Sequence, residues 1–526
     1  MLERLDPRFA DALQRLPDYL GSHVLVSFTA LALGVAISLP LAMRARHRPA
    51  LRGPLLAIAS IAQTIPGLAL LALFYPLLVG LAALSQHYLG VSFSALGFVP
   101  SVLALTLYTM LPVLRNTITG LNGIDAEVHQ AAVGVGMTPK QTLWMVEIPL
   151  ALPVIMAGIR TAAVWVIGTA TLSTPIGQTS LGNYIFTGLQ TQNWVFVLVG
   201  CVAAAVLALV VDQMLALMES GARRRKRWRI AFGFLGLALV VSGALTPVWL
   251  RPATAAYVIG SKPFGEQYIL AALIEQRLRD AGLSAARREG LGSSVAFNAL
   301  AAGEVDAYVD YSGTLWANQL KRTDVKPPAE VLTEVTTQLA AQHGIKVLGS
   351  LGFENAYALA MPSKRAEALG VRAIGDLTSH APQLSIAGDY EFFGRPEWMA
   401  LRDAYALSFR AQRHMQPEFM YPAVGAGDVD VISAYTSDGR IAQHELTVLE
   451  DPKQAIPPYE AILLISPRRA NDRPFVDALQ PLIGAIGVAV MRDANLRSAA
   501  GTADAAPDTV ARWLWQEVQR RKAMAR

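Results

Sequence analysis

The chain has 526 residues, enough for two or three domains, and 53% of them are hydrophobic while only 16% are charged. Its mean hydropathy of +0.36 is too high for an ordinary soluble enzyme. The net charge is +5 and the isoelectric point about 9.2, but the basic residues are concentrated in a few short segments. This distribution argues against nucleic-acid binding, which we do not expect.

Long charge-poor segments fill the first half of the sequence and predict an all-α bundle of membrane-spanning helices. A span needs about 20 apolar residues. We expect six of them, at residues 24–43, 55–85, 98–114, 149–172, 194–218 and 230–250. Pro66 should kink or break the second span. The charged, amphipathic N-terminus is not expected to be a cleavable signal peptide.

The positions of the basic residues predict the orientation of these spans. They cluster at residues 44–52 and in RRRKRWR at 223–229, whereas residues 53–114 and 161–222 contain no Lys or Arg. The positive-inside rule places both clusters in the cytoplasm. With six spans, everything after Arg251 then lies on the extracytoplasmic side of a bacterial inner membrane, and lipid surrounds the bundle.

The predicted cytoplasmic segment 125–149 has a distinctive spacing. Gln130-Ala131-Ala132 is followed after three residues by Gly136, and after nine more by VEIP, which ends at Pro149. Thr138 or Pro139 should open a second short helix after a turn. The spacing resembles the Glu-Ala-Ala loop of binding-protein-dependent ABC importer permeases, with Gln130 replacing the family's Glu. That resemblance implies a coupling helix that docks a separate cytoplasmic ABC ATPase, formed around Gln130, Ala131, Ala132, Gly136 and Pro149.

Catalysis and metal binding find no support in the sequence. The chain has no G-x-x-x-x-G-K-[ST] phosphate loop, so we expect ATP and Mg to be bound by the partner ATPase and no cofactor by this chain. Cys201 is the single cysteine and the eight histidines form no cluster, so no metal site is expected.

Two copies of the chain should pair around the translocation path, because one five-span core cannot enclose it.

After Arg251 the sequence alternates helical and strand patterns, which predicts an α/β fold with mostly parallel sheets. GEVDAYVDY from Gly303 and GDVDVISAY from Gly427 nearly repeat each other. Each predicts a glycine that ends a helix, then a strand, then a tyrosine. Ligands bind beyond the carboxyl ends of such strands, so Tyr311 and Tyr435 should face one cleft from two lobes. Aromatic rings suit a quaternary ammonium, which has no N–H to donate.

Further stretches, among them VIGSKPFGEQ, ENAYAL, YEFFGRPEW, HMQPEFMYPAV and LEDPKQAIPPY, resemble the osmoprotectant-binding proteins for glycine betaine, carnitine and choline. The resemblance covers most of residues 256–460, and fused ergothioneine importers share the order of permease and receptor. It implies a two-lobed periplasmic-binding-protein fold of type II. It also implies that a tyrosine cage is formed by Tyr311, Tyr357, Tyr421 and Tyr435, and that Thr314 contacts the other end of the ligand. Ser261 and Asp310, beside the predicted cleft, complete the predicted site.

The expected organisation is a permease of about five spans at residues 1–222, a basic linker with a sixth anchoring span at 223–252, and a binding domain at 253–526. Its lobe 1 is expected at about 256–356 and 460–515, and its lobe 2 at about 357–459. The expected function is ATP-driven import of a quaternary-ammonium solute of the glycine betaine, choline or carnitine type.

Three alternatives stay open from the sequence. One is import of ergothioneine or another amino-acid-like zwitterion, and a second is import of an anionic substrate. A transporter for anionic or amino-acid substrates should have a buried Arg–Asp pair in place of the tyrosine cage, and Arg440 and Asp438 are candidates for that pair. The third is a membrane-anchored sensor of the same ligand, which would not need the loop around Gly136.

Overall fold

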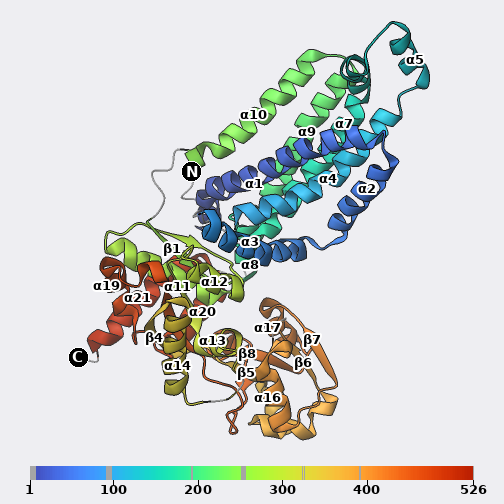
Figure 1. Cartoon of the computed structure of the whole chain (residues 1–526). Coiled ribbons are helices and arrows are strands. Elements are labelled where there is room, and N and C mark those ends of the chain that lie inside the picture. Colours follow the sequence, from blue (N-terminus) through green and yellow to red (C-terminus); the bar gives the residue numbers. More distant parts are fainter. Residues whose placement is uncertain are drawn as a thin grey trace. The chain divides into compact units, whose positions relative to one another are not determined.

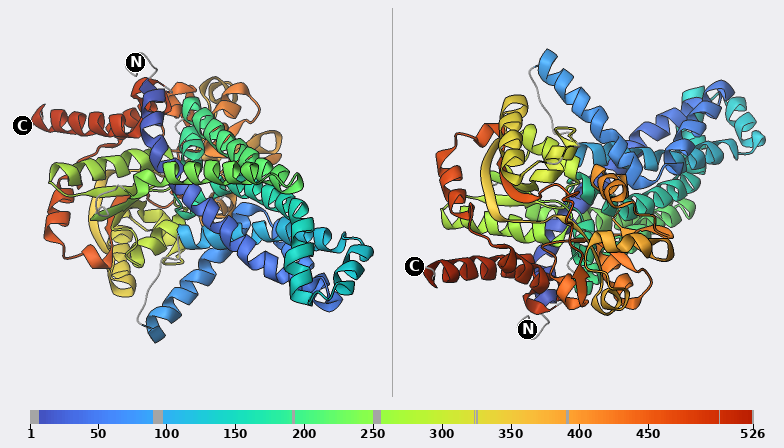
Figure 2. Two further views of the ribbon diagram at one scale, coloured as in Figure 1. Left: turned by 90° about the horizontal axis from the view of Figure 1, so that it is seen from above. Right: turned by 90° about the horizontal axis from the view of Figure 1, so that it is seen from below.

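The computed structural model describes residues 7–89, 97–190, 193–249, 256–322, 324, 326–389, 392–500 and 502–524. Two compact units make up the chain, the first containing Phe9–Ile185 and Val195–Thr254 and the second Ala255–Arg526 (Figures 1 and 2). The first unit is a helical bundle and the second contains two sheets flanked by helices, so the predicted fold class is confirmed. The expected boundary at residues 252 and 253 lies outside the described residues.

Ten α-helices lie before residue 256 in the described part of the chain. They are α1 (Pro7–Ala45), α2 (Pro49–Thr64), α3 (Gly67–Leu89), α4 (Phe98–Asn122), α5 (Ala126–Gly134), α6 (Pro139–Thr142), α7 (Ile148–Ala170), α8 (Gly182–Gln190), α9 (Trp194–Arg223) and α10 (Arg227–Trp249). Helices α4 and α7 pack closely because Gly158 has no side chain. A Cβ there would lie 2.8 Å from the carbonyl oxygen of Pro112.

Five helical stretches in the described residues are long and apolar enough to cross a membrane: Arg8–Ala45, Phe98–Asn122, Pro139–Ile176, Trp194–Arg223 and Arg227–Thr246. They match five of the six predicted spans. The predicted span at 55–85 is instead divided between α2 and α3. The break falls at Ile65, whose extended backbone is the conformation favoured before a proline, here Pro66. Proline therefore breaks this segment, as the sequence predicts.

The second unit holds two five-stranded sheets. The first, which defines lobe 1, has the order β2-β1-β3-β10-β4, and the second, which defines lobe 2, has the order β7-β6-β8-β5-β9. The strands are β1 (Tyr257–Gly260), β2 (Ala285–Arg288), β3 (Ala307–Tyr311), β4 (Lys346–Glu354), β5 (Tyr357–Pro362), β6 (Ser385–Gly388), β7 (Ala411–His414), β8 (Val431–Tyr435), β9 (Leu446–Val448) and β10 (Glu460–Ile465). The chain passes between lobes at residues 355–356, before β5, and again at residue 459, before β10.

Helices cover both sheets (Figure 1). They are α11 (Gly265–Asp280), α12 (Ser293–Ala301), α13 (Ser312–Asn318), α14 (Pro328–His343), α15 (Ser363–Leu369), α16 (Pro396–Tyr405), α17 (Pro417–Ala426), α18 (Arg440–Gln443), α19 (Arg473–Leu479), α20 (Val488–Ala499) and α21 (Pro507–Met524). A large cluster of buried apolar side chains includes residues from both lobes, and a smaller one lies between α17 and the second sheet.

Each sheet is mixed rather than mostly parallel. In lobe 1, β10 runs antiparallel to its neighbours β3 and β4, and in lobe 2, β5 runs antiparallel to β8 and β9. The expectation of mostly parallel sheets holds for β2-β1-β3 and β7-β6-β8. It misses the reversed strand, because a buried apolar run has the same sequence pattern in either direction.

The repeated phrase has the predicted local structure in both lobes. Gly303 and Gly427 follow α12 and α17 with positive φ angles of +72° and +83°, and the strands that come next, β3 and β8, end at Tyr311 and Tyr435. The aspartates of the two phrases are also equivalent. Asp306 accepts a hydrogen bond from Val258 N at 2.8 Å, and Asp430 accepts one from Ser385 N at 2.8 Å. Each phrase therefore fixes the start of the neighbouring strand as well as the position of a tyrosine.

Candidate ligand-binding site

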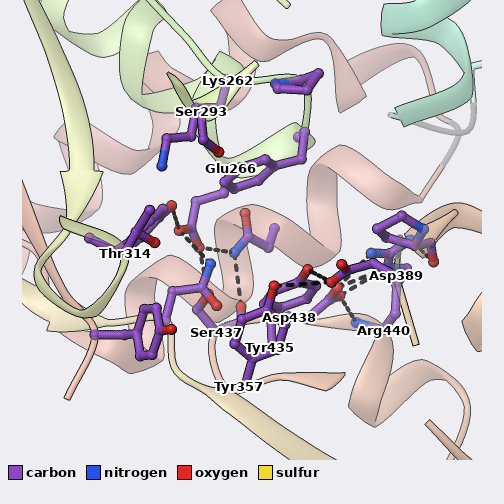
Figure 3. A pocket seen from close by; sticks show the side chains of 18 of the residues that line it. Lys262, Glu266, Ser293, Thr314, Tyr357, Asp389, Tyr435, Ser437, Asp438 and Arg440 are labelled. Atoms are coloured by element: carbon purple, nitrogen blue, oxygen red, sulfur yellow. Dashed lines mark hydrogen bonds and ion pairs between the residues drawn. The ribbon is translucent and has the colours of Figure 1, made fainter. Parts of the chain in front are cut away.

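A cavity of about 310 Å³ lies between the two lobes of the second unit, and Figure 3 shows side chains that line it. Five aromatic residues contribute to its wall: Phe264, Tyr311, Tyr357, Tyr435 and Tyr459. Both lobes supply them, since Tyr311 ends β3 of lobe 1 while Tyr357 begins β5 of lobe 2. Residues of both lobes therefore form the wall of the cavity.

The aromatic wall is densest on the lobe 2 side. The rings of Tyr357 and Tyr435 have centroids 5.0 Å apart, because the two residues are direct partners in the antiparallel pair of β5 and β8. Tyr459 stands perpendicular to Tyr357 at 5.8 Å. On the lobe 1 side, Phe264 and Tyr311 stack at 6.2 Å. Three neighbouring tyrosine rings thus meet at one end of the cavity.

A carboxylate lies at the same end. Asp389 follows β6 and accepts hydrogen bonds from the hydroxyls of Tyr357 and Tyr435, at 3.1 and 2.5 Å, both on Oδ2. The backbone N of Phe392 donates to Oδ1 at 2.9 Å. Burial raises the pKa of Tyr435 well above its ordinary value, and the Asp389 carboxylate acts in the same direction, so the hydroxyl remains a donor. Aromatic faces and a carboxylate together favour a cation.

A second carboxylate, Glu266, lies near the centre of the cavity wall (Figure 3). It accepts four hydrogen bonds, from Tyr311, Asn355, Ser437 and Asn495. Burial raises the pKa of Glu266, and the four hydrogen bonds act in the opposite direction. Four neutral donors are the partners that an ionised, buried carboxylate requires.

Three cationic side chains also line the cavity, and each lies near an acidic group. Lys262 donates to the buried Asp310, the Nη1 of Arg395 lies 3.8 Å from Glu397, and Nη2 of Arg440 is 2.6 Å from Asp438. The charged lining residues are Lys262, Arg395 and Arg440 against Glu266, Asp389 and Asp438. Because this lining is balanced, it suits a ligand that carries both a positive and a negative group.

Two of these cations also lie over tyrosine rings that line the cavity. The Nζ of Lys262 is 5.4 Å from the centroid of Tyr311, and the guanidinium of Arg395 is 5.5 Å from that of Tyr357. A cationic ligand would therefore share these two aromatic rings with cations of the protein. Tyr435 and Tyr459 line the same cavity.

The structure brings together four of the seven predicted site residues: Tyr311, Thr314, Tyr357 and Tyr435 line the cavity. Ser261, Asp310 and Tyr421 are not among its described lining residues. Ser261 is buried beside the end of β1, and Asp310 accepts hydrogen bonds from Lys262 and from the hydroxyl of Tyr308. These two residues support the wall from behind.

Tyr421 lies in the core of lobe 2, which corrects its expected place in the cage. Its side chain is fully buried in the cluster between α17 and the sheet, with Met420 and Val424. The guanidinium of Arg440 covers its ring at 4.2 Å. Its hydroxyl accepts a hydrogen bond from the backbone N of Tyr435 at 3.4 Å. Among the described residues, Tyr459 supplies a further lining tyrosine instead.

Several lining residues escape the sequence reading. Asn355 and Tyr459 sit where the chain crosses between lobes, which no local pattern marks. Asp389 follows the short apolar strand IAG. An acidic residue directly after a buried strand is a pattern that can indicate a binding site. Glu266 was also detectable, because the residues that follow it in the helix are mostly apolar and a carboxylate there demands buried partners.

The predicted coupling segment in the first unit has the expected local structure. Helix α5 is followed by a turn in which Gly136 has a φ of +81°. Thr138 then caps α6, since its hydroxyl accepts from Gln141 N at 3.4 Å while the Gln141 side chain accepts from Thr138 N at 2.9 Å. Val135 and Trp144 are 75% and 64% exposed. The segment thus presents apolar side chains at its surface, as a docking element would.

The five coupling residues differ in exposure. Gln130, Ala131, Gly136 and Pro149 are exposed, whereas Ala132 is buried. Glu147, within the turn of π-helix Leu143–Glu147, is buried and pairs with Arg46 at 2.6 Å. This ion pair ties the segment to the loop between α1 and α2.

Both units match known protein families. Residues 255–517 match the substrate binding domain of ABC-type glycine betaine transport systems, which is half of the chain. Residues 34–224 match the binding-protein-dependent transport system inner membrane component. The two matches follow each other along the chain in the same order as the two units.

Individual known proteins are similar to most or to part of the chain. The ergothioneine transport permease/ergothioneine binding protein EgtU of Helicobacter pylori (strain G27) is 29% identical over 492 residues, covering 90% of this chain and 84% of that protein. The choline transport system permease protein OpuBB of Bacillus subtilis (strain 168) is 40% identical over 197 residues, covering 38% of this chain and 83% of that protein. A crystal structure of a glycine betaine/carnitine/choline ABC transporter covers 50% of this chain and 98% of its own, with 25% identity and a TM-score of 0.45.

Proposed function

Because this chain belongs to the binding-protein-dependent ABC importers and joins a permease to a glycine betaine-type substrate-binding domain, we propose that it captures and imports a quaternary-ammonium zwitterion. The observation that carries this proposal is the group of three neighbouring rings, Tyr357, Tyr435 and Tyr459, in the cavity wall, with the Asp389 carboxylate accepting hydrogen bonds from the first two. A quaternary ammonium cannot donate a hydrogen bond, so aromatic faces and a nearby negative charge are its natural partners.

The binding energy comes from several contacts at the cationic end. A desolvated cation–π contact is worth about 2 kcal/mol. Two or three such contacts, together with the carboxylate, reach the roughly 8 kcal/mol of micromolar binding only if the rings are already in place. Their mutual packing and the hydroxyl contacts on Asp389 support this preorganisation.

The negative end of the ligand would face the opposite part of the cavity. Thr314 lines it and carries a neutral hydroxyl donor, and Lys262 lines it as a cation. A carboxylate, as in glycine betaine or carnitine, would accept hydrogen bonds there. Choline has a neutral hydroxyl in place of the carboxylate and would depend less on Lys262.

A second candidate substrate class is an amino-acid-like zwitterion such as ergothioneine. The partly buried pair of Arg440 and Asp438 lines the same cavity, and such a pair suits recognition of an amino acid. The similarity to the Helicobacter pylori ergothioneine permease and binding protein over most of the chain also favours it. Ergothioneine carries a trimethylammonium group too, so the aromatic end would serve either ligand.

Transport would follow capture. In this proposal the second unit lies on the extracytoplasmic side of the inner membrane, two copies of the chain pair around the path, and a separate ATPase binds residues 125–149. ATP and Mg are held by that ATPase. Tethering the receptor to the permease raises its effective concentration to roughly millimolar, so a weak docking contact suffices.

Calorimetry on the full chain in lipid nanodiscs tests the proposal. Glycine betaine, choline, carnitine, proline betaine and ergothioneine would be titrated against the wild type and against Tyr357→Ala and Tyr435→Ala. We expect at least one ligand to bind, and either substitution to weaken it by at least about tenfold, which is about 1.4 kcal/mol. Binding that survives both substitutions unchanged would contradict the tyrosine cage.

A further inference from the structure

Glu266 lies where the two lobes and one of the chain crossings meet. It lies in the first turn of α11 of lobe 1, and its Oε1 accepts from the hydroxyl of Tyr311 at 2.5 Å and from Asn355 Nδ2 at 3.1 Å. Its Oε2 accepts from Ser437 Oγ at 2.6 Å and from Asn495 Nδ2 at 2.7 Å. Figure 3 shows these hydrogen bonds converging on the carboxylate. Ser437 belongs to lobe 2, so this carboxylate bridges the cleft.

The two sides of the carboxylate have different partners. Oε1 is bound by Tyr311, which lines the cavity in lobe 1, and by Asn355, which lies on the crossing between β4 and β5. Oε2 is bound by lobe 2 through Ser437 and by Asn495 of α20, which also donates to the carbonyl of Ser437 at 2.8 Å. One side chain thus joins a cavity-lining ring, the crossing segment and the opposite lobe.

We propose that Glu266 is a positioning residue that couples ligand contact at Tyr311 to closure of lobe 2 on lobe 1. This inference rests on the proposed function of the cavity. When the lobes separate, Ser437 leaves Glu266 and one lone pair of a buried carboxylate loses its partner, which is costly. Ligand that holds the Tyr311 ring in place keeps its hydroxyl on Oε1, so the closed arrangement of the whole group is favoured.

Glu266 acts through its neighbours rather than on the ligand. Its four donors occupy the acceptor positions of both oxygens, as the geometry of an ionised carboxylate allows. A Gln side chain has only one oxygen, so its NH₂ group would replace either Oε1 or Oε2. That NH₂ group would then face two groups that donate here, either Tyr311 and Asn355 or Ser437 and Asn495. Glu266→Gln therefore preserves the shape and removes the shared acceptor.

Other contacts between α20 and the segment after β8 persist in such a variant. Arg492 Nε donates to the carbonyl of Thr436 at 2.8 Å. The loss of Glu266 should therefore shift the equilibrium between open and closed lobes without separating them fully. Because apparent affinity falls with the fraction of closed protein, the shift should appear mainly in the dissociation rate.

The first test measures closure without any ligand. Spin labels on Thr337 in α14 and Glu367 in α15, both exposed, would report the distance between the lobes of the full chain in nanodiscs, with Cys201→Ser as background. We expect Glu266→Gln to shift the distance distribution to longer values. The matched control is Glu275→Gln, which removes another buried carboxylate of α11, paired with Arg287 at 3.0 Å and outside the cavity lining. It should leave the distribution unchanged.

The second test measures binding kinetics by tryptophan fluorescence. The ligand is whichever of choline, glycine betaine and ergothioneine binds the wild type most tightly. We expect Glu266→Gln to raise the dissociation rate by about tenfold and to change the association rate by less than about twofold. Ser437→Ala should act in the same direction, and it serves as the test if Glu266→Gln does not fold.

The outcomes separate the two proposals. An unchanged distance distribution in Glu266→Gln and Ser437→Ala, or an equal change in Glu275→Gln, overturns the role of Glu266. Failure of the wild type to bind any of the three probes overturns the proposed function, while the distance measurement still decides on Glu266.

Discussion

Tyr357 and Tyr435 donate their hydroxyls to the same carboxylate oxygen of Asp389, although the two tyrosines lie on different strands, 78 positions apart by their numbers. Because β5 and β8 are antiparallel, the two residues are direct partners in the sheet and their rings lie side by side. The carboxylate therefore fixes both rings at once and places a negative charge beside them. This arrangement leads to the first prediction.

Substitution of Asp389 by Asn should weaken binding of a quaternary-ammonium ligand by at least about tenfold, since a tenfold loss requires only about 1.4 kcal/mol and the charge is removed. Calorimetry on the full chain measures this effect. Asp403→Asn is the matched control, because Asp403 is exposed and pairs only with neighbouring Arg402 in the described contacts. Equal affinities of the Asp389 variant and the wild type would remove this carboxylate from the site.

Gly313→Ala should displace Tyr459 from the cavity wall. A Cβ at Gly313 would lie 2.7 Å from Cε2 of Tyr459 and 2.8 Å from the carbonyl oxygen of Pro458, which is closer than real Cβ atoms come. We expect about tenfold weaker ligand binding with little loss of secondary structure. Gly394→Ala is the control, since nothing lies within 4 Å of its added Cβ. Full affinity in Gly313→Ala would show that Tyr459 does not contact the ligand.

Tyr421→Leu and Tyr459→Leu should have opposite effects. Tyr421 is packed in the core of lobe 2 under Arg440, so its replacement should lower the free energy of unfolding by about 2 kcal/mol and leave affinity within about threefold. Tyr459→Leu should raise the dissociation constant of the ligand more than Tyr421→Leu does, and should lower the free energy of unfolding less. Thermal melting and calorimetry on the same samples distinguish them. A large loss of ligand affinity in Tyr421→Leu would indicate that the Tyr421 ring contributes to the binding site after all.

Gly136→Ala should uncouple transport from ATP hydrolysis. Its φ of +81° costs a non-glycine residue about 1–2 kcal/mol, so the turn between α5 and α6 would change shape. We expect lower uptake and lower ligand-stimulated ATP hydrolysis in vesicles with the ATPase present, and unchanged ligand binding. Gly134→Ala is the matched control, because Gly134 is helical and nothing lies within 4 Å of an added Cβ. Normal transport by Gly136→Ala would contradict a coupling role.

His444 should make the stability of lobe 2 depend on pH. Burial lowers the pKa of His444, the nearby Arg440 lowers it further, and Asp438 opposes both. The unfolded chain takes up a proton near the ordinary pKa of 6.5, whereas the folded chain does so only at lower pH. Stability contributed by neutral His444 is thus present above pH 6.5 and lost as the pH falls through the folded-state pKa.

Melting temperatures of the wild type and His444→Gln between pH 7.5 and 5.5 measure this contribution. We expect the wild type to lose more stability on acidification than the variant. Parallel curves would mean that another group controls stability in this range.

The sequence predicts those features that depend on local patterns. The glycine, strand and tyrosine of each repeated phrase, the helix break at Pro66 and the turn before Thr138 all follow from backbone preferences of a few residues. These preferences act through neighbours in the chain, so a single sequence is enough to detect them.

The features that escape prediction depend on contacts between distant segments. Tyr421 and Tyr435 are only 14 positions apart, but α17 turns the first into the core while β8 directs the second to the cavity. The reversed strands β5 and β10 and the partners of Glu266 likewise arise from chain crossings between lobes. No local signal distinguishes these outcomes, because tertiary packing decides them.

The reciprocal hydrogen bonds between Thr138 and Gln141 have a mechanical consequence. A short helix with unpaired ends unravels under load and absorbs the displacement applied to it. Closing the first turn of α6 in this way stiffens it at the point where the chain continues toward α7. A displacement of α6 by a bound partner would therefore be transmitted to α7 with little loss.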